Sequence, residues 1–255
     1  MKSLLSVVAI LPFLFFSCRS GVEEPVVEAE KEIYEWRIYS LTDGDTTSLD
    51  DYFEDVLIPA YNRQGVEVGA FELYQPAETA LRYLFFAYPT IETFRQVSRA
   101  VWEDPDFRRD AQPFFDTTAP DPVYSNFETY LCEAFDSLPR LRKPDEERTL
   151  FEFRIYHSPN EEANLRKIKM FQEGEIAIFD EVGINSVCYG NVLAGPRMPA
   201  LTYLTWYKDE PTRNAAWDGF RAHPQWLRMK SLPEYAHTAT NKTNRLLLPM
   251  PYSQY

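Results

Sequence analysis

Three chemical types of side chain, a carboxylate, a guanidinium and a phenol, occur at alternate positions in two short segments of the chain. These residues are Glu35, Arg37 and Tyr39 in the first segment and Glu152, Arg154 and Tyr156 in the second. An arginine can hold a carboxylate or an enolate through parallel hydrogen bonds, and a tyrosine hydroxyl can donate a hydrogen bond or a proton. The same residues can also pair with one another and serve only structure. Both interpretations stay open.

The spacing places the polar residues of each segment on one face of a β-strand, because successive side chains of a strand point to opposite faces. The other face is apolar in both segments. Its residues are Tyr34, Trp36 and Ile38 in the first segment and Phe151, Phe153 and Ile155 in the second. We expect the apolar faces to contact helices, which places the polar faces in an interior between two sheets. A charge there requires a partner, because an isolated buried charge is strongly destabilising.

The two segments belong to an internal repeat. Residues 34–39 recur as residues 151–156, Gly65 recurs as Gly183, and residues 81–84 recur as residues 201–204. Such a repeat predicts two domains of ordinary size, at 33–137 and 149–255, with a proline- and charge-rich linker at 138–148.

Each half predicts the element order β-α-β-β-α-β, which is the ferredoxin-like fold. The predicted strands are 33–39, 66–74, 81–88 and 123–135 in the first half and 151–156, 185–191, 201–207 and 245–248 in the second. Helices on one face of each sheet leave the other face bare, and packing the two bare faces together covers both. The sequence therefore predicts an α+β protein with two tandem ferredoxin-like repeats packed sheet to sheet.

Several motifs resemble those of the NIPSNAP family, within the dimeric alpha-beta barrel superfamily. They are Arg-Ile-Tyr in each opening strand, a helix that ends in glycine before a strand, a Tyr-Leu strand, and Asp-Pro-x-Phe at 104–107 or His-Pro-x-Trp at 223–226. The resemblance covers both halves, from Ile33 to about Pro249. It implies the barrel fold and kinship with small-molecule enzymes such as antibiotic-biosynthesis monooxygenases and chlorite dismutases. The family has no agreed catalytic residues, so the resemblance transfers none.

The first 32 residues predict export and a lipid anchor. Lys2 precedes an apolar run at 4–16, which is shorter than the roughly 20 residues of a membrane-spanning helix and is typical of a signal peptide. The run ends in Phe-Ser-Cys, which resembles the lipobox of bacterial lipoproteins. We expect a signal peptide at 1–17, a lipid on Cys18, an acidic tether at 18–32, and a location in the cell envelope, at a bacterial membrane facing the periplasm or the cell surface. An ordinary secretory signal is the alternative.

The composition and motifs of the chain argue against several classes of partner. The chain has 26 Lys and Arg against 39 Asp and Glu, a net charge of −13, which argues against a nucleic-acid partner. We find no cofactor fingerprint and no metal-ligand spacing, so we expect no cofactor and no metal. Cys132 and Cys188 lie in different halves, and we expect two buried thiols rather than a bridge.

Two further residues could do chemistry but have simpler explanations. Glu175 falls on an apolar helical stripe, and we expect a kink at Gly174 to rotate it outward. His223 precedes a proline, as Asp104 does in the first half, so we expect both residues to cap helices.

Together these features predict a membrane-anchored NIPSNAP-type protein that binds a small organic molecule between its two repeats. The second half is the favoured location, because its strands carry more varied polar residues. The alternative is a non-catalytic accessory or protein-interaction lipoprotein whose barrel interior is closed by ion pairs. Enzyme activity and oligomeric state stay open. The expected ligand-binding residues are Arg37, Tyr39, Glu152, Arg154, Tyr156 and Tyr203.

Overall fold

The computed structural model describes residues 30–42, 46–117 and 122–255. The predicted signal peptide, the lipidation of Cys18 and most of the acidic tether lie outside these residues and stay predictions. Within the described part of the chain, no helix combines the length and the apolar character needed to cross a membrane.

The first repeat contains four strands and two helical segments in the order β-α-β-β-α-β. A long helical stretch follows the first strand and consists of two α-helices joined by a π turn. The elements are β1 (Ile33–Leu41), α1 (Thr47–Tyr52), the π turn Phe53–Leu57, α2 (Ile58–Arg63), β2 (Val68–Leu73), β3 (Leu81–Tyr88), α3 (Ile91–Glu103), α4 (Pro105–Thr117) and β4 (Tyr124–Ala134).

The second repeat has the same order, including a π turn within its first helical stretch. The elements are β5 (Leu150–His157), α5 (Glu161–Met170), the π turn Phe171–Glu175, α6 (Ile176–Val182), β6 (Asn185–Ala194), β7 (Ala200–Tyr207), α7 (Glu210–Ala222), α8 (Pro224–Met229), a short 3-10 turn (Pro233–Tyr235) and β8 (Asn241–Pro249).

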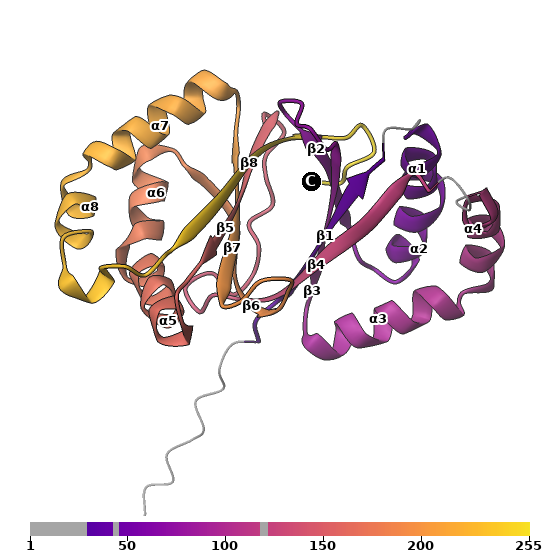
Figure 1. Ribbon diagram of the computed structural model, residues 1–255, viewed down its shortest axis with the longest axis horizontal. Coiled ribbons are helices and arrows are strands. Elements are labelled where there is room, and N and C mark those ends of the chain that lie inside the picture. The colour runs from indigo at the N-terminus through magenta and orange to yellow at the C-terminus, as the bar shows by residue number, and fades with distance from the viewer. Residues whose placement is uncertain (1–29, 43–45, 118–121) are drawn as a thin grey trace, which may run out of the picture.

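The eight strands form one closed barrel in the order β1-β3-β2-β8-β5-β7-β6-β4. Each repeat contributes four neighbouring strands, and the repeats join where β2 pairs with β8 and where β4 pairs with β6. Figure 1 shows α1 to α4 outside the strands of the first repeat and α5 to α8 outside those of the second. The predicted α+β fold of two tandem ferredoxin-like repeats, packed sheet to sheet as a barrel, is confirmed.

Apolar side chains from both repeats fill the centre of the barrel. The ring of Trp36 lies 4.6 Å from that of Phe85 and 4.2 Å from that of Phe153, between ring centroids. Phe71 and Phe151 pack against each other nearby, 4.9 Å apart. The expectation that the apolar faces of β1 and β5 contact helices is therefore wrong, because these faces point into the barrel.

The polar faces of the same strands point toward the helices. Arg37 donates a hydrogen bond to the hydroxyl of Tyr61 in α2. The ring of Tyr156 packs against that of Phe171 in the second π turn. The physical reason is desolvation, since a closed and filled barrel offers an ion neither water nor space. The layer between sheet and helices leaves the Arg37 side chain 15% exposed and the Arg154 side chain 14% exposed.

The π turn of the second repeat holds Glu175 inward. A side chain on Gly174 would clash with Met229, so glycine allows α8 to pack closely against this turn. Glu175 is 2% exposed, and the expected outward rotation is wrong. A π turn inserts an extra residue into the helical period, and here it keeps the carboxylate under the helices.

The other local predictions have mixed outcomes. Cys132 and Cys188 are both buried and form no disulfide, as expected. Burial raises the pKa of the Cys132 thiol to about 12.

Asp104 accepts a hydrogen bond from the backbone N–H of Asp106, as a cap does. The His223 side chain makes no cap bond, and its Nε2 lies 3.1 Å from a carboxylate oxygen of Glu181 instead.

Candidate functional site

Two cavities occupy equivalent places between the sheet and the helices of the two repeats. The first cavity, of about 110 Å³, is lined by Arg37 and Tyr39 together with aromatic residues of the helices and β4. The second cavity, of about 210 Å³, is lined by Arg154 and Tyr156 together with residues of α5, the second π turn, α7, α8 and β8. The structure therefore divides the predicted site residues between two places and brings none of them into the barrel centre.

The arginine of the first cavity is held by a short network. Its Nε donates to Oε1 of Glu35 at 2.6 Å, and its Nη2 donates to the hydroxyl of Tyr61 at 2.6 Å. The hydroxyl of Tyr88 donates to the other oxygen of Glu35 at 2.8 Å. The guanidinium of Arg37 also lies over the ring of Phe86, 4.6 Å from its centroid. Glu35 thus neutralises Arg37 at the base of the cavity.

Tyr39 gives the first cavity an aromatic wall. Its ring lies 5.0 Å from that of Phe53, 5.1 Å from that of Tyr124 and 4.9 Å from that of Phe127. Burial raises the pKa of the Tyr39 phenol to about 12, against the opposing effect of the Arg37 charge. The phenol is therefore neutral at pH 7 and can donate a hydrogen bond.

Glu152 is the anchor of the second site. Its two oxygens accept hydrogen bonds from Arg154, from Arg213 at 2.7 and 2.9 Å, and from the indole of Trp217 at 2.7 Å. Burial alone would raise the pKa of Glu152, but the hydrogen bonds of Arg213 and the charges of both arginines outweigh it, so the pKa is lowered. Glu152 lies behind the cavity wall, where it positions Arg154.

Arg154 connects Glu152 to a pair of tyrosines. Its guanidinium stacks on Trp217, 3.8 Å from the ring centroid, and its Nη1 donates to the hydroxyl of Tyr156 at 3.0 Å. The hydroxyls of Tyr156 and Tyr203 are 2.9 Å apart. Tyr203 is fully buried behind Tyr156, and burial, reinforced by Tyr156, raises the pKa of its phenol well above the usual value. Tyr203 thus supports the wall, while Arg154 and Tyr156 form it.

An ion pair that the sequence interpretation missed also lines the second cavity. Nζ of Lys167 lies 2.6 Å from Oε2 of Glu175, and both side chains are almost completely buried. The ammonium group sits over the ring of Phe171 at 4.5 Å and near that of Trp226 at 5.7 Å. Such an aromatic surround favours a cation.

The two repeats differ in polarity at these two positions. The π turns at 53–57 and 171–175 align the repeats, and this alignment places Leu49 opposite Lys167 and Leu57 opposite Glu175. Both leucines are buried. Comparing the two halves residue by residue, rather than each helix alone, would therefore have identified the pair from the sequence.

Positive charge dominates the wall of the second cavity. Arg154, Lys167, Arg221 and Lys242 line it, with Glu175 as the one carboxylate among its lining residues. The ammonium of Lys242 lies 4.9 Å from the ring centroid of Tyr156. In a chain with a net charge of −13, this is a local positive potential that attracts an anion.

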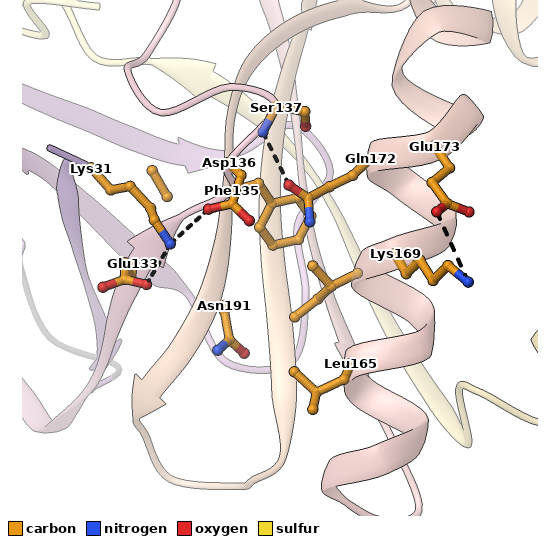
Figure 2. A pocket seen from close by; sticks show the side chains of 12 residues that line it. Lys31, Glu133, Phe135, Asp136, Ser137, Leu165, Lys169, Gln172, Glu173 and Asn191 are labelled. Atoms are coloured by element: carbon orange, nitrogen blue, oxygen red, sulfur yellow. Dashed lines mark hydrogen bonds and ion pairs between the residues drawn. The ribbon is translucent and has the colours of Figure 1, made fainter. Parts of the chain in front are cut away.

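A wider groove of about 670 Å³ lies between the end of β4 and α5. Figure 2 shows its charged groups turned toward one another rather than toward the open space. Lys31 pairs with Glu133 at 3.1 Å and with Asp136 at 2.7 Å, and Gln172 accepts a hydrogen bond from the backbone of Ser137. The Lys31 contacts tie the start of the first repeat to its end, the Gln172 contact ties that end to the second π turn, and the groove is not the candidate site.

Metal binding finds no support among the residues that the structure describes, since no three of their His, Cys, Asp or Glu side chains are grouped to hold an ion.

The chain is similar in fold to several proteins of known structure. Its fold matches a protein of Fusobacterium nucleatum provisionally named a monooxygenase, with 12% identity, coverage of 86% of this chain and 92% of that one, and a TM-score of 0.55. A protein of Lactobacillus acidophilus with a similar provisional name matches with 8% identity, coverage of 86% and 94%, and a TM-score of 0.56. At these identities the likeness concerns the fold alone.

A NIPSNAP-like domain protein of Burkholderia xenovorans is 24% identical over 43% of this chain and 92% of its own, with a TM-score of 0.39. No curated protein matches the chain. The NIPSNAP family model matches residues 151–254. This match covers nearly the whole second repeat, which is therefore similar to the NIPSNAP family.

Proposed function

We propose that this is a membrane-anchored NIPSNAP-type protein that binds a small organic anion in the second cavity. The sequence interpretation placed the ligand between the two repeats, but Trp36, Phe85 and Phe153 occupy that space. The proposed site therefore lies beneath α5, the second π turn, α7 and α8. Its volume of about 210 Å³ is smaller than the roughly 300–1,000 Å³ of pockets for drug-sized ligands, so it suits a compound with one ring or a short chain.

The observation that carries this proposal is the buried pair Lys167 and Glu175. A buried ion pair is a poor source of stability, because desolvation offsets the attraction between its charges. The first repeat builds the same helix, turn and sheet with Leu49 and Leu57 at these positions. The first repeat thus forms the same architecture without the pair, and the place of the pair in the cavity wall supports a role in binding.

The remaining wall fits an anion. Arg154 presents a planar guanidinium fixed by Glu152 and Trp217, and Lys242 adds a second cation beside Tyr156. Charge-assisted hydrogen bonds of this kind are the strong ones in proteins. A carboxylate or an enolate is the group we expect the site to hold.

Binding can be measured by titration calorimetry with a panel of small aliphatic and aromatic carboxylates. We expect at least one to bind the wild-type protein, and we expect the double variant Lys167→Leu with Glu175→Leu, which copies the first repeat, to bind it at least tenfold more weakly. Lys169→Leu is the matched control, because Lys169 lies on the exposed side of α5 and pairs with Glu234. Absence of binding by the wild-type protein to the whole panel, or equal binding by the double variant, would overturn the proposal.

The membrane part of the proposal rests on Cys18 and the apolar run before it. Replacing Cys18 with alanine removes the thiol to which we expect the lipid to be attached, so we expect the protein to leave the membrane fraction when cells are fractionated. Membrane association that survives this change would contradict the anchor.

The alternative is a non-catalytic accessory or protein-interaction lipoprotein. The filled centre of the barrel supports it, although apolar packing closes that space instead of the ion pairs expected from the sequence. The calorimetric panel separates the two functions, because an accessory protein of this kind would bind none of the small anions.

A further inference from the structure

We infer that Glu175 acts as a base toward a 2-oxo acid bound in the second cavity, so that the protein interconverts the keto and enol forms of that acid. This inference rests on the proposed function, because the substrate must first bind through its carboxylate. It adds a reaction, a substrate class and a catalytic residue to a binding site.

The carboxylate of Glu175 has one oxygen to spare. Oε2 accepts the hydrogen bond of Lys167. Oε1 makes no hydrogen bond to any residue that the structure describes. It is not one of the fully buried atoms that lack a partner, so part of its surface is accessible. Glu175 lines the second cavity, and this surface therefore faces the cavity. A carboxylate oriented in this way can accept a proton from a bound compound.

The second π turn and its neighbours fix the position of this base. Glu175 is the last residue of the turn, and the absence of a side chain on Gly174 lets Met229 pack directly against it. Lys167 is held over Phe171 while it pairs with Glu175. A base held by packing and an ion pair needs little reorganisation before it reacts.

The cations are placed for the two charges of the reacting compound. The carboxylate of a 2-oxo acid would bind Arg154 or Lys242. Lys167 lies beside Glu175 and would stabilise the negative charge that develops on the carbonyl oxygen. Tyr156 stands between them, with the Lys167 and Lys242 ammonium groups 5.6 and 4.9 Å from its ring centroid. Fixed positive groups at a developing oxyanion are the largest single contribution in many enzymes.

The step balances within the site. The proton on the carbon beside the carbonyl moves to Oε1 of Glu175, the electron pair of the broken C–H bond forms the carbon–carbon double bond, and the carbonyl π pair becomes a lone pair on oxygen. The oxygen then takes a proton from Lys167 or water, and the proton on Glu175 returns to the neutral Lys167 or to the hydroxide left by the water, so that both side chains regain their starting charge. No electron leaves or enters the substrate, so the reaction needs no oxidant, reductant or cofactor.

The first cavity is an internal comparison for this chemistry. Leu57 occupies the position of Glu175, and Leu49 occupies that of Lys167. The first cavity keeps an arginine and a neutral phenol but has no base at this position. We therefore assign the reaction to the second repeat alone.

The test uses 2-oxobutanoate and phenylpyruvate with the full chain. Exchange of the hydrogens at carbon 3 with deuterium is followed by NMR, and binding is followed by calorimetry. We expect the wild-type protein to accelerate exchange and Glu175→Gln to lower the rate about 100-fold, within the usual range for a general base, while its dissociation constant does not rise, because the cations that bind the anion remain and a like charge is removed. Glu173→Gln, in the same turn but exposed, is the matched control and should keep the full rate.

The outcomes separate the two proposals. Binding of the 2-oxo acids without faster exchange overturns the reaction and leaves the binding site standing, whereas no binding of any anion overturns the proposed function itself. A full rate in Glu175→Gln excludes Glu175 as the base. If the glutamine variant melts early, Glu175→Asp keeps the carboxylate, and it should restore part of the rate if Glu175 is the base and none if another group is.

Discussion

The first and second cavities share their scaffold and differ in the polarity of their walls. Each lies between a four-stranded half of the barrel and a helix interrupted by a π turn, and each has an arginine held by a glutamate two residues earlier. The first repeat has the buried leucines Leu49 and Leu57, of which Leu57 lines the cavity, where the second repeat has the ion pair of Lys167 and Glu175 in the cavity wall. The comparison teaches that the fold does not depend on charge at these positions, so charge there can be used for something else.

The anchoring glutamates differ as well. Glu35 accepts hydrogen bonds from Arg37 and Tyr88, whereas Glu152 accepts hydrogen bonds from two arginines and a tryptophan. In the first repeat, the helix positions equivalent to Arg213 and Trp217 hold Phe94 and Ser98. Arg154 is consequently held more firmly than Arg37, which suits a group that must present a fixed cation to a ligand.

The largest expected effect follows from breaking the ion pair on one side. Lys167→Leu leaves Glu175 buried without its partner, which for buried pairs destabilises a protein by about 3–5 kcal/mol. Urea unfolding of the variant and the wild type measures the difference. A loss below about 1 kcal/mol would mean that water reaches Glu175 freely and that the two cavities differ less than their walls suggest.

Removing both charges should have a smaller effect of opposite sign. The double variant Lys167→Leu with Glu175→Leu makes the second repeat resemble the first, and replacing a buried ion pair with apolar residues is often neutral or stabilising by about 1–4 kcal/mol. The same urea experiment tests it. Marked destabilisation would show that the pair is structural after all, and the case for a binding role would lose its main support.

The smallest effect is a change in pH dependence through Glu152. Because its pKa in the folded protein is lowered from 4.5, Glu152 contributes stability that is fully present above the pKa of the unfolded chain and is lost as the pH falls through the lower, folded value. The stability difference between the wild type and Glu152→Gln should therefore shrink as the pH drops below about 4.5. Thermal melts between pH 7 and pH 3 measure this difference, and a constant gap across that range would contradict the lowered pKa.

Much of the fold was predictable because the signals were local and repeated. The recurrence of residues 34–39 as 151–156 gave the two halves, and the alternation in each segment correctly separated Glu35, Arg37 and Tyr39 from their apolar neighbours. The orientation of the two faces was not predictable from alternation. Both faces of each strand are covered, one by helices and one by the opposite sheet, so neither contacts bulk water to serve as a reference.

The candidate site was predictable only in part. Arg154 and Tyr156 do line the second cavity, while Tyr203 and Glu152 lie behind its wall. Glu175 was misjudged because the outward rotation expected at Gly174 does not occur, and the side chain stays on the buried stripe that its spacing indicates. The periodicity of one helix places this carboxylate inward but does not identify Lys167 as its partner.

The pairing of β2 with β8 and of β4 with β6 has a consequence for how the two halves can diverge. In a barrel made from two identical subunits, any substitution is introduced twice and must suit both copies. Here both halves lie on one polypeptide, so barrel closure does not depend on protein concentration. One half can then accept an unfavourable group while its neighbour preserves the fold.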